Sequence, residues 1–166
     1  MATTKVTNAV ISAPGQVVQV VNVMDSAVTT ATTVHVLDDT VPQNTEGVEF
    51  MTLAVTPTNA SNLLKIDVVV GAVADSGADA HFIAALFQDS TANALAAVSN
   101  YNGSGASRCC NMMFVHYMAA GTTSSTTFKV RAAGHNAGTM TLNGRVGARL
   151  FGGVMASSIT ITEILA

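Results

Sequence analysis

Short runs rich in Val, Thr and Ile recur along the chain and are separated by Gly, Asn, Asp, Ser or Pro. Some runs alternate strictly between apolar and polar residues, as where Phe128 and Val130 alternate with Lys129 and Arg131. A period of two places the two kinds of residue on opposite faces of a β-strand, whereas a helix would mix them. The alternation therefore predicts an all-β protein.

Turn-forming residues bound ten such runs, each of which we expect to be a strand. The Ala-rich stretch over residues 82–98 has helical propensity, but turn residues at 89–93 divide it into runs too short for a typical helix. The predicted strands cover residues 17–24, 28–37, 48–56, 63–73, 81–89, 94–100, 109–118, 126–132, 139–143 and 154–164.

Ten short antiparallel strands suggest two sheets packed face to face, in a sandwich of the jelly-roll kind. We expect residues 1–16 to form an N-terminal arm and residues 17–166 a single domain. Sheet edges need shielding, and the usual Lys and Glu are scarce in a chain that is only 10% charged. We therefore predict that copies of the chain cover one another as a homotrimer, while strand periodicity leaves a dimer open.

Composition narrows the classes of function. A hydrophobic content of 49% and a mean hydropathy of +0.42 exclude a disordered chain. Seven Lys and Arg residues and a net charge of -3 argue against nucleic acid as a partner. No apolar run approaches the roughly 18 to 20 residues of a membrane-spanning helix, so we expect no membrane insertion. The adjacent Cys109 and Cys110 are expected to be free thiols, because a bond between neighbours would be strained.

The residues that carry chemistry are dispersed. Acidic residues around a Gly within positions 75–79 suggest a calcium loop, but the further oxygen ligands and the closing Glu are missing, so a turn is expected. The acidic cluster within positions 38–49 is expected to be a solvated loop rather than a cation site. The histidines occur singly, without the spacing of metal ligands, at His35, His81, His116 and His135. We expect no catalytic residue, no metal and no cofactor, and hence not an enzyme. A metal-dependent jelly-roll enzyme, or an ion held by histidines on a symmetry axis, are the alternatives left open.

The most distinctive residues are Asn143-Gly144 and the closing run of residues 147–164, GARLFGGVMASSITITEI. This run resembles the end of many phage virion surface proteins, described as tail-fibre or structural proteins. Residues 38–47 (DDTVPQNTEG) and 87–89 (FQD) resemble the same group. The resemblance extends from about Lys5 to the end of the chain. It implies a trimeric jelly roll, similar to tumour-necrosis-factor and C1q heads, that is displayed on a particle and carries no catalytic residue.

The function expected from this resemblance is that of a capsid decoration or cement protein, made in the host cytoplasm and located on the virion surface. The implied partners are further copies of the chain and phage capsid or tail proteins. The alternative is the receptor-binding head of a tail fibre, which would contact a host-surface glycan. A secreted signalling head of the C1q kind would need an export signal, which is not visible in the sequence.

Three sets of residues are predicted to carry these contacts. An N-terminal docking arm would use Lys5, Val6, Val10 and Ile11. The subunit interface would contain Leu150, Phe151, Met155, Ile159 and Ile161. For Leu150, Phe151 and Met155 the alternative is the subunit's own core. Loops that could meet a receptor contain Asp75, Asp79, Tyr101, Asn102, Arg108, His135 and Asn136.

Overall fold

A computed structural model describes residues 13–75, 81–101, 108–136 and 138–166. Over these residues the chain forms twelve β-strands and one short 3-10 turn, η1 (Phe151–Gly153), so the all-β prediction is confirmed. The strands are β1 (Val17–Asp25), β2 (Thr29–Ala31), β3 (Val48–Val55), β4 (Leu63–Asp75), β5 (His81–Gln88), β6 (Ala96–Tyr101), β7 (Cys109–Ala119), β8 (Thr126–Gly134), β9 (Met140–Leu142), β10 (Gly144–Arg145), β11 (Ala148–Arg149) and β12 (Ser157–Ile164).

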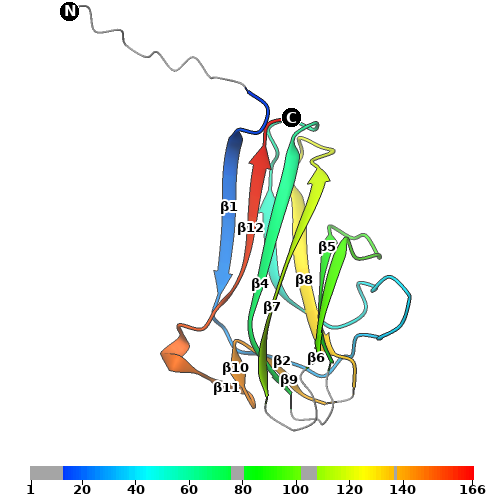
Figure 1. Cartoon of the computed structure of the whole chain (residues 1–166), viewed down its shortest axis with the longest axis vertical. Helices are drawn as coiled ribbons and strands as arrows, with labels where there is room; N and C mark the ends of the chain where they lie inside the picture. Colours follow the sequence, from blue (N-terminus) through cyan, green and yellow to red (C-terminus); the bar gives the residue numbers. More distant parts are fainter. Residues whose placement is uncertain (1–12, 76–80, 102–107, 137) are drawn as a thin grey trace, which may run out of the picture.

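Two antiparallel sheets make up the body of the molecule (Figure 1). The first sheet has the order β1-β12-β4-β7. The long strand β4 pairs with β7 along one edge, and with β12 and then β9 along the other, so β9 and β2 extend this sheet at one end. The second sheet has the order β3-β8-β5-β6 and lies behind the first in Figure 1.

A single apolar core lies between the sheets. The first sheet contributes alternate side chains of β4 and β12, such as Ile66 and Ile161, and the second contributes Phe82, Leu86 and Phe128, all of them buried. Removing such side chains from water is the main favourable contribution to folding, at roughly 25 cal/mol per Å² of apolar surface. The core therefore explains why the strict alternation in the sequence is needed.

The strands pair in a nested order. β1 pairs with β12, β3 with β8, β4 with β7, and β5 with β6, so the first half of the chain pairs with the second half in reverse. This arrangement places the two ends of the described chain on neighbouring strands, β1 and β12. It also brings one end of each of the strands β4, β5, β6, β7 and β8 to the same end of the molecule, at residues 75, 81, 101, 109 and 134.

Two predicted strands are corrected by the structure. Of residues 28–37, only Thr29–Ala31 forms a strand, because the chain then leaves the sheet and the His35 N–H donates to the Gly134 carbonyl. Of residues 154–164, the strand begins at Ser157, because η1 and its left-handed Phe151 precede it. The short pair β10 and β11 was not predicted, since two-residue strands carry no periodicity.

Glu163 ties the ends of the first sheet to the turn between β3 and β4. Its buried carboxylate accepts hydrogen bonds from the side chains of Gln19 (2.6 Å) and Asn62 (2.6 Å) and from both the backbone N–H and the hydroxyl of Thr58. Burial alone would raise the pKa of Glu163, but these hydrogen bonds outweigh it and hold the pKa below its usual value. The carboxylate is therefore ionised in the folded protein at neutral pH.

Candidate subunit interface

The outer side of the β1-β12-β4-β7 sheet faces away from the core, and we call it the open face. Figure 1 looks onto this sheet. The strand register aligns its outward-pointing residues in three rows across the sheet. The rows are Val20-Thr162-Lys65-Tyr117, Asn22-Thr160-Asp67-Val115 and Met24-Ser158-Val69-Met113.

Large apolar side chains line both margins of the open face. Met24 on β1 and Met113 on β7 each expose 71% of their surface, and Val20, Val115 and Tyr117 are also exposed. The hydroxyls of β12 separate the two margins. Exposed apolar clusters of this kind are typical of interaction sites, and margins of apolar residues with hydroxyls between them suit a protein–protein contact.

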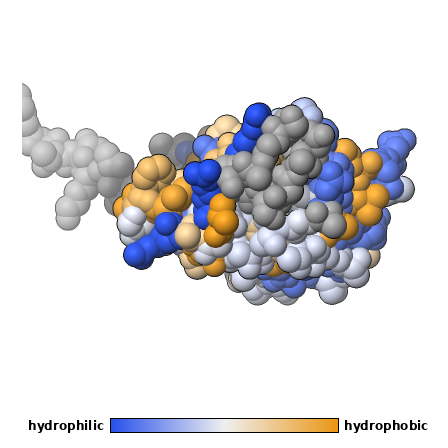
Figure 2. All heavy atoms as spheres, turned by 90° about the horizontal axis from the view of Figure 1, so that it is seen from below, coloured by the Kyte–Doolittle hydropathy of each residue, from blue (hydrophilic) through white to orange (hydrophobic). Residues whose placement is uncertain are grey.

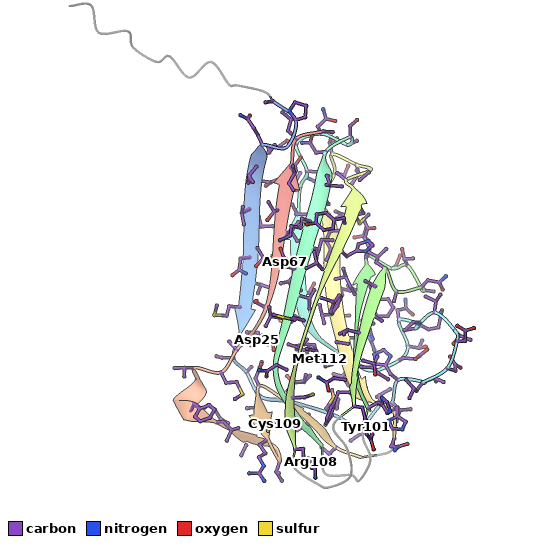
Figure 3. All side chains as sticks on the ribbon, in the orientation of Figure 1. Asp25, Asp67, Tyr101, Arg108, Cys109 and Met112 are labelled. Carbon is purple, nitrogen blue, oxygen red and sulfur yellow. The ribbon has the colours of Figure 1, made fainter. Side chains whose placement is uncertain are left out.

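The only charged side chains in the three rows neutralise one another. Lys65 Nζ and the Asp67 carboxylate lie 2.8 Å apart in the middle of the face, where Figure 3 labels Asp67. The hydrogen bond to Asp67 raises the pKa of Lys65. A copy of the chain laid on the open face would therefore meet no unpaired charge there.

Some of the interface residues predicted from the sequence lie in the subunit's core, and others lie at its surface. Ile159 and Ile161 are fully buried in the subunit's own core, which corrects their assignment to a subunit interface. The neighbouring hydroxyl residues of β12 point outward instead. Leu150 and Met155 are half-buried, and Phe151 is exposed on a projecting segment.

The residues of the β7 margin are not among those predicted from the sequence to form the interface. Cys110, Met112, Phe114 and Met118 do face the core, but Met113, Val115 and Tyr117 face outward on the same strand. A strand that is apolar on both faces was the available signal.

The outer side of the second sheet is already covered by the chain itself, and we call it the covered face. Ile83, Ala85 and Phe87 point outward from β5 and are nevertheless buried. Segment 34–47 crosses them: the Arg131 guanidinium donates to the carbonyls of residues 46 and 47, and the N–H of residue 44 donates to the carbonyl of residue 92. Lys129 and Arg131 also lie near Glu49, at 3.7 and 3.6 Å.

His35 anchors this segment. Its ring is completely buried, and Nδ1 lies 3.3 Å from the Glu46 carboxylate. Burial lowers the pKa of His35, although Glu46 opposes the shift. The ring is therefore neutral at pH 7, with Nδ1–H directed at Glu46 and Nε2 left without a hydrogen-bond partner among the described residues.

Some of the predicted receptor residues meet at one end of the molecule. The ring of Tyr101 lies 4.7 Å from that of His81, which lies 5.0 Å from that of His135. The His81 N–H also donates to His135 Nδ1 at 2.9 Å. Figure 3 places Tyr101 and Arg108 at this same end, and Asn136 is exposed one residue beyond His135.

The remaining predicted residues are placed as follows. Asp79, Asn102 and the docking-arm residues Lys5, Val6, Val10 and Ile11 lie outside the described residues, as does the side chain of Asp75.

The described part of the chain contains no group of three or more His, Cys, Asp or Glu residues that could hold a metal ion. Cys109 and Cys110 are free, and burial raises the pKa of the Cys110 thiol to about 11, so it is a poor nucleophile. The described residues form no helix that is long and apolar enough to cross a membrane. No family model matches this sequence, and no curated protein matches it.

Proposed function

We propose that this protein is a bacteriophage virion structural protein, a homotrimeric jelly roll that decorates or cements the particle surface. The observation that carries the proposal is the open face, with exposed apolar residues on both margins and an internally neutralised ion pair at its centre. Such a surface suits lasting burial against copies of the same chain.

The nested strand pairing supports the jelly-roll part of the proposal. Eight strands that pair as first with last, second with seventh, third with sixth and fourth with fifth form two four-stranded sheets when the hairpin is rolled up. Here β1, β3, β4, β5, β6, β7, β8 and β12 pair in that order. The chain resemblance to phage surface proteins favours the same architecture.

The two apolar margins support a closed oligomer. They lie on opposite edges of the sheet, on β1 and on β7, so β1 of one copy can pack on β7 of the next. A head-to-tail contact of this kind forms a ring when the rotation closes, and the resemblance favours three copies. Binding of the ring to an assembled shell then stabilises the assembled state by mass action.

Counting the chain in purified phage particles tests the virion role. A decoration protein is expected in a number set by the capsid lattice, and adding it to particles that lack it should raise their resistance to heat. Lysate from a host that expresses the chain without the phage, taken through the same purification, serves as the control. Absence of the chain from intact, infectious particles would overturn the proposal.

The second candidate, the receptor-binding head of a tail fibre, is favoured by the cluster of Tyr101, His81 and His135 at one end of the molecule. An exposed aromatic ring beside polar side chains suits a sugar ring. This candidate predicts a few trimers per particle and glycan binding that Tyr101→Ala abolishes, with Thr123→Ala, in an exposed turn outside the ring cluster and the open face, as the control.

A further inference from the structure

Residues 144–156 project from the end of the first sheet, and we call them the flap. They comprise β10, β11 and η1, followed by the approach to β12. Large apolar side chains of the flap are among the most exposed that the structure describes. Val154 exposes 84% of its surface, Phe151 73% and Val146 64%, compared with 71% for Met24 and Met113 on the open face. Figure 2 shows apolar and hydrophilic surface side by side at this end (left).

Two of these residues hold unfavourable backbone conformations. Val146 has φ 51° and Phe151 has φ 48°, in the left-handed region that β-branched and bulky residues rarely adopt. Two residues of the flap therefore combine a strained backbone with a large apolar side chain exposed to water. Strain of this kind is characteristic of binding segments.

The base of the flap is anchored rigidly. The buried Asn143 side chain donates to the carbonyls of Asp25 (2.9 Å) and Ala27 (3.0 Å), and it accepts a hydrogen bond from the buried hydroxyl of Ser157 (2.6 Å). Any side chain at Gly144 would overlap the carbonyl oxygen of residue 148. The flap is therefore preorganised, which lowers the entropy cost of binding.

The flap also carries unpaired positive charge. Most charged side chains that the structure describes form a hydrogen bond or an ion pair. The exceptions among the described residues are Arg145 and Arg149 on the flap and Asp39 in segment 34–47. No acidic residue lies between positions 90 and 162 in the sequence, so the flap is purely cationic.

A matching hollow lies beside Asp39. It has a volume of about 370 Å³, and its walls come from residues 38–42 and 94–97. Asp38 and Asp39 give it negative charge, and Val41, Pro42 and Leu95 give it apolar walls. The Asp38 carboxylate is held in place by the N–H and hydroxyl of Thr40. The volume is that of a small ligand pocket, so it admits a large side chain such as Phe.

We propose that the flap of one copy docks into the Asp39 hollow of the next copy, with Phe151 inside the hollow and Arg149 beside Asp39. The charges are complementary, and each copy has one flap and one hollow. In Figure 1 the flap projects on the β1 side (orange, lower left), whereas segment 34–47 lies on the β6 side (right). The contact thus runs in the same head-to-tail direction as the packing of β1 on β7, and it rests on the proposed homo-oligomer.

Reversing the charges in the full-length protein tests the contact. Arg149→Glu is expected to raise the dissociation constant between subunits by about tenfold or more, because truncated charge pairs at interfaces commonly cost that much. Adding Asp39→Arg in the same chain should restore the wild-type value to within a few fold. The double change Thr123→Glu with Ser125→Glu, in the exposed turn after β7, makes the same change in net charge outside the flap and should have no effect. Native mass spectrometry over a dilution series measures each value.

The outcomes separate this proposal from the proposed function. If the wild type is oligomeric and Arg149→Glu associates as tightly, the flap contact is wrong and the oligomer stands. If Arg149→Glu weakens association but Asp39→Arg does not restore it, the hollow is the wrong partner. A monomeric wild type overturns both. Should Arg149→Glu fail to fold, Asp39→Arg alone, in a separate exposed segment, must give the same weakening.

Discussion

The outer sides of the two sheets differ in what covers them. On the covered face, segment 34–47 buries Phe87 and its neighbours, and nearby charges are paired with the same chain. On the open face, Met24 and Met113 remain mostly in water among the described residues. Both faces have apolar side chains. They differ because a segment of the same chain packs on the covered face, whereas no described segment packs on the open face. We infer that other copies supply to the open face what segment 34–47 supplies to the covered one.

The largest effect is expected on the covered face. Phe87→Ala removes a buried ring and should lower the free energy of unfolding by about 3 to 5 kcal/mol, as large-to-small core changes do. The subunit dissociation constant of the folded fraction should not change, because Phe87 lies away from the open face. Chemical denaturation and sedimentation of the same sample measure the two quantities. A loss of less than about 1 kcal/mol would mean that segment 34–47 does not cover this ring tightly.

The open face should respond in the opposite way. Val115→Arg places an unpaired charge in the β7 margin and should raise the subunit dissociation constant about 100-fold, with the unfolding free energy of the monomer nearly unchanged. Thr123→Arg, in an exposed turn after β7, adds the same charge and is the control. It should change neither the subunit dissociation constant nor the unfolding free energy. Unaltered association of Val115→Arg would show that β7 is not buried between copies.

Glu163 supports both faces from within, so its loss should lower stability without discriminating between them. Glu163→Gln keeps the shape but removes the charge, and it should cost about 2 kcal/mol in unfolding free energy at pH 7. Because the folded pKa is lowered, this contribution is present above the usual pKa of 4.5 and is lost as pH falls through the folded value. Urea unfolding from pH 7 to pH 3 should therefore show the two proteins converging in acid. Parallel curves would contradict the assigned role.

A smaller effect of pH should single out the covered face. The pKa of His35 is lowered in the folded state, so the unfolded chain takes up the proton first and stability falls as pH drops below 6.5. We expect a loss of about 1 kcal/mol by pH 5, and a flatter profile in His35→Gln. Burial also lowers the pKa of His116, so His116→Gln is the comparison variant. It should keep most of the dependence of stability on pH. An identical slope in wild type and His35→Gln would rule out this anchor.

Much of the fold follows from local pattern. The alternation of Phe128 and Val130 with Lys129 and Arg131 is confirmed as core-facing against outward-facing residues of β8. The pattern failed for residues 34–37, because Val34, Val36 and Leu37 favour a strand locally while the burial of His35 and its backbone bond to Gly134 hold them in a loop. That constraint depends on residues about 100 positions away, which no local window contains.

The candidate interface was harder to predict than the fold. Periodicity assigns Ile159 and Ile161 to one face of their strand, but it does not say whether that face meets the core or a copy. The register across four strands decides, and it assembles residues from positions 20 to 162 on the open face. The flap is also invisible in the sequence, since nothing local predicts left-handed backbone at Val146 or Phe151.

The mass of the full-length protein in solution tests the central claim most directly. The claim is that the open face is buried between copies. Light scattering on a sizing column, at protein concentrations well above micromolar, should give three times the chain mass of 16.9 kDa. It should also leave Met113 slow to react with a soluble methionine oxidant. A mass of one chain at the same concentrations, with Met113 oxidised as fast as in unfolded protein, would contradict the account.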